Sequence, residues 1–316
     1  MNPIGGYFEL ELPNFSEYHR NAIRLNTGRN ALEYILRVRE YKRIFIPYFT
    51  CDVLLQPIRK LGLQFEFYRI DDNLEAMFNF EKLKAEDVFL YTNYFGLKSD
   101  YITKLINQTA NIILDYSQSF FTMPVEGIDT FYSPRKFFGV PDGGYLYCDK
   151  DMTDQLEVDT SIYRIKHLIE RIDIGAEEGY SSFRANDKKL DNLPIREMSV
   201  FTRRMLKAID YEAIASKRRR NFDLLNKKLG RLNNLSINLN GDPVPMVYPL
   251  VTDKKGLREK LIRSKIFVAT YWPNVLEWAN EEGSVEMKLT KQLLPLPIDQ
   301  RYSETDLERI INIIYG

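Results

Sequence analysis

Two strings of residues in the first half of the chain carry side chains that could act together in a reaction. One is the apolar run Ile112-Ile113-Leu114, which ends in Asp115, and the other is a turn rich in serine, proline and glycine that contains Lys136. A lysine amine can form a Schiff base with a carbonyl, and a carboxylate can keep a ring nitrogen protonated and electron-withdrawing. A strand-ending acid followed about twenty residues later by such a lysine is what pyridoxal phosphate (PLP) chemistry needs.

Other residues could complete a site of this kind. Gly28, Arg29 and Asn30 open an expected helix, where backbone N–H groups and the helix dipole favour a phosphate group. Ser133 could add a hydroxyl to the phosphate, and Gln118 could donate to the phenolate oxygen of the ring. Each of these residues alone is weak evidence for a cofactor site. A glycine turn before a helix, for example, is most often structural.

Aromatic residues near these strings suggest a ring contact and a special environment for the lysine. Tyr48 and Phe49 follow the strand-ending Pro47, so either could stack on the pyridine face, although core packing explains both equally well. Lys136 has two aromatic residues on each side. We therefore expect it to lose some solvation, which would leave more of its amine neutral and able to attack a carbonyl.

The composition excludes several other classes of protein. The 316 residues include 44 Lys+Arg and 44 Asp+Glu, so there is no basic surplus for nucleic acid. Two cysteines and two histidines cannot form a disulfide framework or a His-rich metal site, and we expect no metal. The N-terminus has no apolar signal segment, and no run approaches the ~20 apolar residues of a membrane helix. We expect a cytoplasmic protein.

Strand and helix patterns alternate through the first half of the chain. The expected strands span residues 43–47, 65–70, 88–93, 111–114, 127–132 and 144–148, and expected helices include residues 31–36 and 51–61. This alternation predicts an α/β fold with a mostly parallel sheet covered on both faces. Ligands of such sheets bind at the carboxyl ends of strands, where Asp115 falls.

The second half has a different pattern and predicts a smaller α+β domain. We expect helix over 152–174, a polar loop over 175–192, a long helical stretch over 198–229, further strands and helices over 246–251, 257–265 and 266–271, and a last helix, 307–315, capped near Ser303. The basic run Lys217-Arg218-Arg219-Arg220 is interpreted as a solvated helix face. We expect a large PLP-binding domain over residues 1–210 and a small domain over 211–316.

With these motifs in place, the chain resembles the DegT/StrS-like sugar aminotransferase family of fold-type I PLP-dependent enzymes. The similarity extends over nearly the whole chain and includes Thr27-Gly28-Arg29-Asn30-Ala31-Leu32, Ile46-Pro47-Tyr48-Phe49-Thr50, Tyr94-Phe95-Gly96-Leu97, Leu114-Asp115-Tyr116-Ser117-Gln118, Tyr132-Ser133-Pro134-Arg135-Lys136, Asp142-Gly143-Gly144 and Leu293-Leu294-Pro295-Leu296-Pro297-Ile298.

The resemblance implies an activity and a role for each site residue. It implies a homodimer with active sites at the subunit interface, which transfers an amino group, commonly from glutamate, to a keto-sugar nucleotide in polysaccharide or deoxysugar biosynthesis. Lys136 is similar to the Schiff-base lysine that moves the proton, Asp115 to the pyridinium partner and Gln118 to the ring-oxygen contact. Arg29 and Asn30 are similar to phosphate contacts made through backbone amides.

The chain also departs from the family pattern. Phe131 stands where the family has a phosphate-contacting serine, and Ser133 is the expected substitute. Cys51 alters the aromatic or hydroxyl pattern after the Pro-x-x-Thr turn. Tyr271 and Trp272 match a family segment near the cofactor, so they could line the substrate entrance, although core packing is an equal alternative.

Two other hypotheses stay open at the level of sequence. The same cofactor and fold could carry out a lyase, dehydratase or other reaction at the α-carbon. A non-catalytic paralogue could instead keep the fold and the dimer and act as a binding protein. Lys136 and Asp115 favour an enzyme over the latter.

Overall fold

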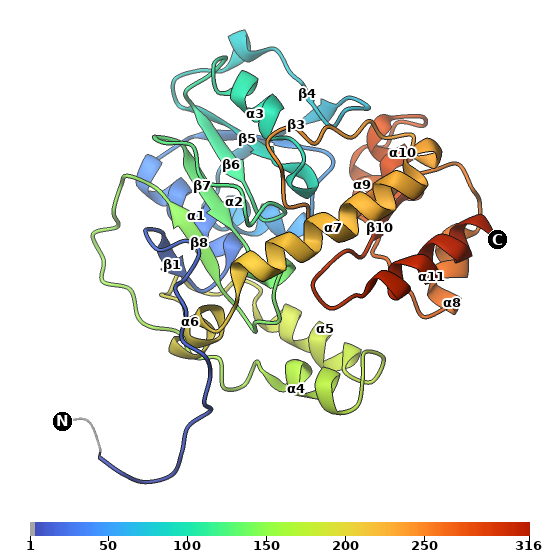
Figure 1. Cartoon of the computed structure of the whole chain (residues 1–316). Helices are drawn as coiled ribbons and strands as arrows, with labels where there is room; N and C mark the ends of the chain where they lie inside the picture. Colours follow the sequence, from blue (N-terminus) through green and yellow to red (C-terminus); the bar gives the residue numbers. More distant parts are fainter. Residues whose placement is uncertain (1–3) are drawn as a thin grey trace.

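A large mixed sheet forms the centre of the protein, for which a computed structural model describes residues 4–316 (Figure 1). In these residues the sheet has eight strands in the order β1-β8-β7-β6-β5-β2-β3-β4. The strands are β1 (Ile23–Leu25), β2 (Arg43–Pro47), β3 (Gln64–Ile70), β4 (Ala76–Met77), β5 (Asp87–Thr92), β6 (Ile112–Asp115), β7 (Asp129–Tyr132) and β8 (Gly144–Tyr147). The five adjacent strands β3, β2, β5, β6 and β7 pair in parallel, and the pairings of β8, β1 and β4 are antiparallel. The predicted α/β fold with a mostly parallel sheet is confirmed.

Apolar residues of the central strands point alternately to two cores, because successive side chains of a strand face opposite sides. Ile44 and Ile46 of β2 pack in one core with the inner face of α1 (Gly28–Arg39). Phe45 and Phe89 pack in the core on the opposite face. The sheet is therefore buried on both sides, as parallel sheets require.

The rest of the chain is mainly helical and adds a second, small sheet. The other helices are α2 (Leu55–Lys60), α3 (Ser99–Leu105), α4 (Lys166–Asp173), α5 (Tyr180–Lys189), α6 (Val200–Lys207), α7 (Tyr211–Leu229), α8 (Leu257–Arg263), α9 (Val275–Trp278), α10 (Val285–Gln292) and α11 (Glu304–Tyr315). The strands β9 (Tyr248–Val251) and β10 (Leu293–Leu296) pair antiparallel. A third core joins α7, α8 and α11 to this small sheet, and α7 runs along the front of the molecule in Figure 1.

The segment after β8 differs from its sequence-based prediction. Of the helix expected over 152–174, only α4 forms. The chain before it is extended, because Asp159 donates its backbone N–H to the carbonyl of Glu197, and Glu197 donates to Glu157. The loop expected over 175–192 instead contains α5, a helix with so few buried side chains that its sequence shows no apolar period.

Two more predictions needed correction in the C-terminal third. The stretch 198–229 is two helices, because Asp210 caps a new helix by accepting from the N–H of Ala213. Residues 266–271 form no strand, since the carbonyls of Val268 and Ala269 accept from Arg258 rather than from a neighbouring strand. The last helix is confirmed, with a capping box between Ser303 and Asp306.

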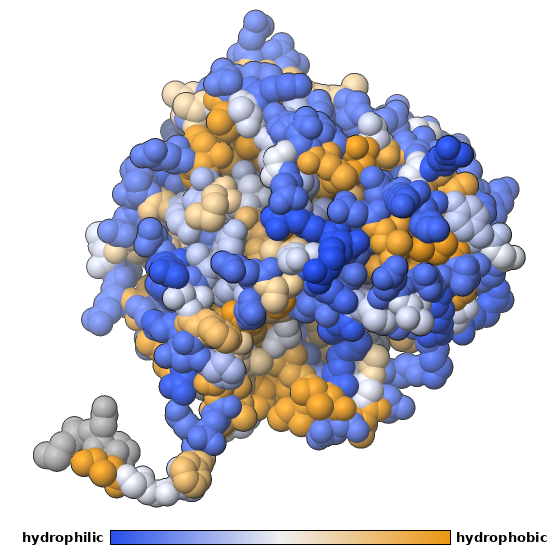
Figure 2. Space-filling model, viewed as in Figure 1, coloured by the Kyte–Doolittle hydropathy of each residue, from blue (hydrophilic) through white to orange (hydrophobic). Residues whose placement is uncertain are grey.

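Apolar side chains are exposed on two segments. Residues 4–16 extend away from the body in Figure 1 and carry Tyr7 and Phe8 almost fully exposed. Figure 2 shows apolar atoms gathered at the lower edge of the same view, where Figure 1 places α4 and α5. No helix within residues 4–316 is long and apolar enough to cross a membrane.

Candidate active site

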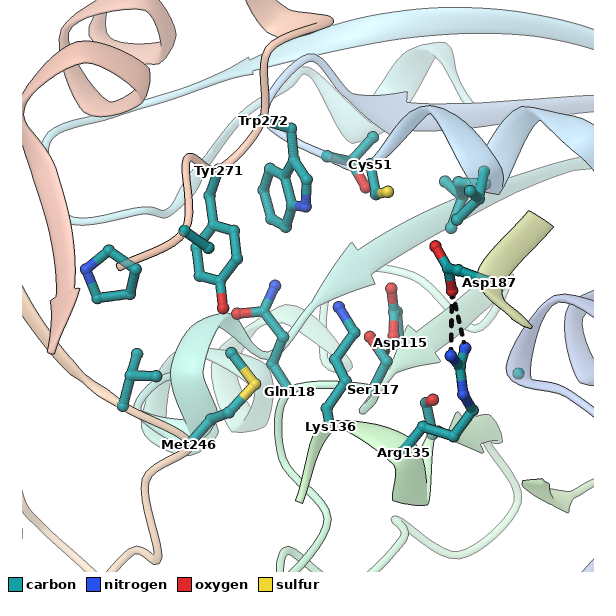
Figure 3. Close-up of a pocket in the computed structure, with 18 of the residues that line it drawn as sticks. Cys51, Asp115, Ser117, Gln118, Arg135, Lys136, Asp187, Met246, Tyr271 and Trp272 are labelled. Carbon is teal, nitrogen blue, oxygen red and sulfur yellow. Dashed lines mark hydrogen bonds and ion pairs between the residues drawn. The ribbon is translucent and has the colours of Figure 1, made fainter. Parts of the chain in front are cut away.

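The predicted site residues meet in one cavity of about 530 Å³ at the carboxyl end of the parallel strands. Lys136, Asp115, Gln118 and Ser133 line it, and the start of α1 contributes Gly28 and Arg29. Figure 3 shows the amine of Lys136 pointing into the space between Asp115 and Gln118. Strand-end residues from β6 and β7 and the first turn of α1 thus converge, as the parallel topology predicted.

Lys136 ends a short 3₁₀ helix, Pro134–Lys136, that follows β7. Its side chain is exposed to the cavity, whereas the neighbouring Phe137 and Phe138 turn into the core. The expected loss of solvation from aromatic neighbours is therefore wrong, because the flanking rings pack away from the amine. The lysine is free to meet a ligand in the cavity.

Asp115 is the last residue of β6 and is buried. One carboxylate oxygen accepts from the backbone N–H of Ser117 at 2.8 Å, and the other lies 3.5 Å from the hydroxyl of Thr92. Burial raises the pKa of this carboxyl above its ordinary value, and the hydrogen bonds from Ser117 and the charge of Lys136 only partly oppose the shift. A cationic partner in the cavity would favour the ionised carboxylate.

Gln118 is buried and fixed through one end of its amide. Its Oε1 accepts from the backbone N–H of Phe95 at 3.0 Å. Its Nε2 has no hydrogen-bond acceptor among the described residues, and Figure 3 places the amide between Lys136 and Tyr271. Because Gln118 lines the cavity, this amide nitrogen can donate to a ligand oxygen there.

The start of α1 forms another part of the wall. Thr27 caps the helix by accepting from the backbone N–H of Asn30 at 3.0 Å, and the Asn30 side chain donates to the carbonyl of Leu193. Asn30 does not line the cavity. The free N–H groups expected for an anion are therefore those of Gly28 and Arg29, the first two residues of the helix.

The glycine pair after Lys136 brings β8 against this helix. Gly143 has φ of +116°, and a Cβ on Gly144 would lie 2.5 Å from the carbonyl carbon of Thr27. A side chain at Gly144 would push the turn away from the start of α1. The Asp-Gly-Gly string therefore keeps Ser133 beside the helix N-terminus. The Cβ of Ser133 lies 3.5 Å from the position that a Cβ on Gly28 would occupy.

The predicted stacking residues lie outside the cavity wall. The ring of Tyr48 stacks on Phe67 with centroids 4.7 Å apart, and the buried ring of Phe49 packs edge-on to Trp272. The wall near these positions is formed by Cys51, whose thiol pKa is raised by burial and lowered in part by the charge of Lys136. Either ring would have to move to stack on a ligand.

Sequence reasoning missed most of the opposite wall. Tyr271 and Trp272, which the sequence left ambiguous, do line the cavity. Arg135 pairs with Asp187 of α5 at 3.1 Å, which brings α5 to the site, although that segment was expected to be an irregular loop. Arg218 also reaches the wall, against the interpretation of its basic run as a solvated face. The residues next to these arginines and aspartates in the sequence form no pattern that predicts the contacts.

A second cavity of about 900 Å³ adjoins the first. The two share wall residues from both halves of the chain, among them Lys136, Phe183 and Arg218. The second cavity is also lined by cationic side chains that include Arg171 and Arg309. Together the cavities offer room for a substrate much larger than an amino acid.

The chain has the fold of the fold-type I aminotransferases. No family model and no curated protein matches the chain by sequence. Solved structures described as aminotransferases, some of them as sugar aminotransferases, match it over more than nine-tenths of its length at low identity.

Three of these structures show the extent of the match. DesV from S. venezuelae, in complex with a ketimine intermediate, has 16% identity over 93% of this chain and 83% of its own, with a TM-score of 0.67. A DegT DnrJ EryC1 StrS aminotransferase from Brucella abortus has 20% identity over 93% and 85%, with a TM-score of 0.65. A putative sugar aminotransferase from Streptococcus pneumoniae in its PMP form has 14% identity over 92% and 86%, with a TM-score of 0.67. At these identities the match establishes the fold.

Proposed function

We propose that the protein is a PLP-dependent aminotransferase that acts on a keto-sugar nucleotide, with glutamate as the amino donor. The observation that carries the proposal is the convergence of Lys136, Asp115 and Gln118 on one cavity at the strand ends of this fold. The residues fit PLP, because the cavity pairs an accessible amine with a buried carboxylate and holds an amide donor that lacks an acceptor. When bound, PLP supplies the electron sink for bond breaking at the α-carbon.

The chain's own residues have distinct roles in this proposal. Lys136 would hold the cofactor through a Schiff base and, once the amine of the donor has displaced it, its freed Nζ would take and return the proton of the donor's α-carbon. Asp115 would keep the ring nitrogen protonated, and the ion pair would offset the burial that raises the pKa of this carboxyl. Gln118 donates through Nε2 to the ring oxygen.

The phosphate is assigned to the start of α1. The N–H groups of Gly28 and Arg29 and the hydroxyl of Ser133 lie on the same wall of the cavity. A helix N-terminus favours an anion through its unpaired donors and its dipole. Ser133 then takes the place of the serine that Phe131 replaces.

The size of the acceptor is supported by the second cavity. Its volume of about 900 Å³ and its arginines suit a large anionic substrate such as a nucleotide-linked sugar. The matched structures described as sugar aminotransferases support the same class of acceptor. A role in polysaccharide or deoxysugar biosynthesis, in the cytoplasm, follows as part of the proposal.

A homodimer with the site at its interface is also proposed. Exposed apolar side chains on and beside α4 and α5 include Ile172, Tyr180 and Phe183, and Phe183 lines both cavities. A second copy covering this surface would bury it and close the site. Within each copy we propose a large domain over residues 1–210 and a small domain over 211–316.

The test is covalent capture of the cofactor by Lys136. Wild-type protein mixed with PLP and then reduced with borohydride should gain the cofactor mass on a peptide that contains Lys136, whereas Lys136→Ala should gain none there. Lys150→Ala, at an exposed lysine outside the cavity, is the matched control and should behave as wild type. Addition of glutamate before reduction should prevent capture by converting the cofactor to its amine form.

Each alternative has its own outcome in this test. If the protein captures PLP and neither glutamate nor any other amino acid or keto sugar prevents the capture, the result would favour a lyase or another reaction at the α-carbon. A folded wild-type protein that captures no PLP would contradict the proposal of a PLP-dependent enzyme. The hypothesis of a non-catalytic binding paralogue would then remain.

A further inference from the structure

The N-terminal arm, residues 4–16, is held to the body by few contacts. The backbone N–H of Phe15 donates to the carbonyl of Lys207 at 2.6 Å, and Glu9 pairs with Arg204 of α6 at 2.7 Å. These are the only hydrogen bonds and ion pairs of the arm within residues 4–316. Ordering a segment costs conformational entropy that contacts must offset, so an arm with so few contacts of its own is suited to contacts with another molecule.

Apolar side chains of the arm are left uncovered by its own body. Tyr7 is 99% exposed, Phe8 91% and Leu10 62%. Leu10 and Leu12 line a groove of about 490 Å³ between the arm and the body, and Ile162 lies on the other wall of this groove. Aromatic side chains that become buried are the commonest anchors of protein interfaces, so Tyr7 and Phe8 are the candidates for such anchors.

A second uncovered surface is the outer side of α4 and α5, which we call the α4–α5 surface. Each helix buries one side chain, His167 on α4 and Asn186 on α5. Ile169, Ile172 and Tyr180 are instead 49%, 84% and 56% exposed. Monomeric proteins rarely expose a contiguous apolar patch larger than about 300–600 Å² unless a partner covers it.

The arm and the α4–α5 surface adjoin each other. Figure 1 shows the arm leaving the body beside α6, at the same lower edge that carries α4 and α5. Between them, Ile162 lines the groove of the arm, and the neighbouring Tyr163 is 79% exposed. The carbonyl of Tyr163 accepts from Lys189 of α5 at 3.0 Å. Exposed apolar side chains therefore continue from the base of the arm to the two helices.

The charges of the two surfaces are complementary. The arm contains Glu9 and Glu11 and no basic side chain. Glu9 has its partner on α6, but Glu11 pairs with no base in the part of the chain that the structure describes. On the helices, Arg171 and Arg184 are exposed and have no carboxylate within 4.0 Å among residues 4–316. An acidic apolar segment and a basic apolar surface attract each other through both charge and burial.

We propose that the arm of each copy lies across the α4–α5 surface of a second copy of this chain. Fully extended, residues 4–14 reach about 35 Å, enough to cross two helices that are each ~10 Å wide. In a symmetric pair each copy gives one arm and receives one, so the same exchange buries both surfaces. Because Ile172 and Tyr180 also line the second cavity, the partner's arm borders the mouth of that cavity. This inference rests on the proposed homodimer.

Self-association of the full chain tests the exchange. Sedimentation equilibrium of wild-type protein should give a dimer, and Tyr7→Ser combined with Phe8→Ser should raise the Kd of the dimer by about tenfold or more, because each copy loses two aromatic anchors. Ile172→Ser should weaken association from the receiving surface. Asn14→Ser, at an exposed polar residue of the same arm, is the matched control and should associate as wild type.

Cross-linking tests where the arm lies. Phe8→Cys and Tyr180→Cys are prepared as separate proteins and mixed with a short bis-maleimide linker. The expected product joins residue 8 of one chain to residue 180 of the other, identified by the mass of the linked peptides. In the control, Lys104→Cys, at an exposed residue of α3, replaces Tyr180→Cys and should give no such product with Phe8→Cys.

Capture of PLP separates this inference from the proposed enzyme. Capture by Lys136 should persist in the arm variants, so that weaker association with intact capture supports the exchange. If wild type captures no PLP, the proposed enzyme fails, and sedimentation and cross-linking still test the arm. If the double serine variant does not fold, the cross-linking experiment decides.

Three results would overturn the exchange. One is association of the double serine variant at the wild-type Kd. Another is wild-type protein that captures PLP but is a monomer at every concentration, which would also reject the homodimer. The third is a link between residues 8 and 180 that forms only inside a single chain carrying both cysteines, which would mean that the arm folds back on its own body.

Discussion

Two fully buried charges flank the turn that carries Lys136, and they are satisfied in different ways. Asp142, six residues after the lysine, accepts hydrogen bonds from Ser161 at 2.6 Å and Thr202 at 2.5 Å and pairs with Arg164 at 3.2 Å. Arg218 has backbone carbonyls and the ring of Phe137, whose centroid is 4.7 Å from its Cζ, and its Nε has no partner. Both oxygens of Asp142 are thus satisfied by hydroxyls and an opposite charge, although the buried Nε of Arg164 also has no partner. Arg218 differs because no carboxylate balances its charge.

Asp142→Ala should have the largest effect on stability. It removes the shared acceptor of several buried hydroxyls and one partner of Arg164, so we expect a loss of about 3–5 kcal/mol in the free energy of unfolding. Urea unfolding of cofactor-free protein measures it, and Asp151→Ala, at an exposed acid, is the control. A loss below about 1 kcal/mol would show that these contacts of Asp142 contribute little to stability.

His19 tests whether another buried polar group also has all its hydrogen bonds supplied by the protein. Its ring is fully buried, with Nε2 2.8 Å from the carbonyl of Phe120 and Nδ1 3.1 Å from the hydroxyl of Tyr147. Burial lowers its pKa from 6.5 to about 4, so the unfolded chain binds the proton more readily and stability is lost as pH falls from about 6.5 toward 4. The loss should be on the order of 3 kcal/mol.

Unfolding at a series of pH values measures this loss. His19→Phe should flatten the dependence between pH 6.5 and 4, whereas His167→Gln, at the other histidine, should keep most of it. An unchanged slope in His19→Phe would mean that other groups cause the acid sensitivity.

Arg218→Met should lower the free energy of unfolding of cofactor-free protein by less than Asp142→Ala does. Three carbonyls lose a donor, but a desolvated charge without a carboxylate partner is removed, so we expect a net loss of at most about 1–2 kcal/mol. The same urea experiment compares the two variants directly. A loss equal to that of Asp142→Ala would remove the contrast between the two charges.

Asp115→Asn should have the smallest effect, and of opposite sign. The raised pKa means that stability is highest when the carboxyl is protonated and falls as pH rises through its pKa in the folded protein. At neutral pH the uncharged amide should therefore stabilise cofactor-free protein by about 1 kcal/mol. The same variant should bind PLP more weakly, and a variant that is less stable without PLP would contradict the reasoning.

The part of the site that the large sheet and α1 form could be predicted from the sequence, because short stretches of sequence are enough to indicate it. The strand-ending Asp115, the Lys136 turn and the Gly28 helix start each follow from residues adjacent in sequence, and parallel topology brings them together. These elements were placed to within a few residues of their observed bounds.

The opposite wall could not be predicted in the same way. Arg218 sits in a run of four basic residues on an exposed-looking helix, and its burial depends on carbonyls 27 and 81 residues away in sequence. The helix α5 has no apolar period, because its inner side chains face a cavity rather than a core. Long-range contacts of single polar side chains leave no periodic trace.

The carbonyl of Phe137 has a consequence for movement in the protein. It accepts hydrogen bonds from both Arg218 at 3.3 Å and Gln300 at 3.0 Å, and it belongs to the Phe137–Phe138 peptide, one residue beyond Lys136. A displacement of α7 or of the segment at Gln300 would have to stretch or break one of these hydrogen bonds. The C-terminal part of the chain is therefore tied to the backbone one residue beyond the lysine, and a substrate that favours one position of this part also favours one position of that backbone.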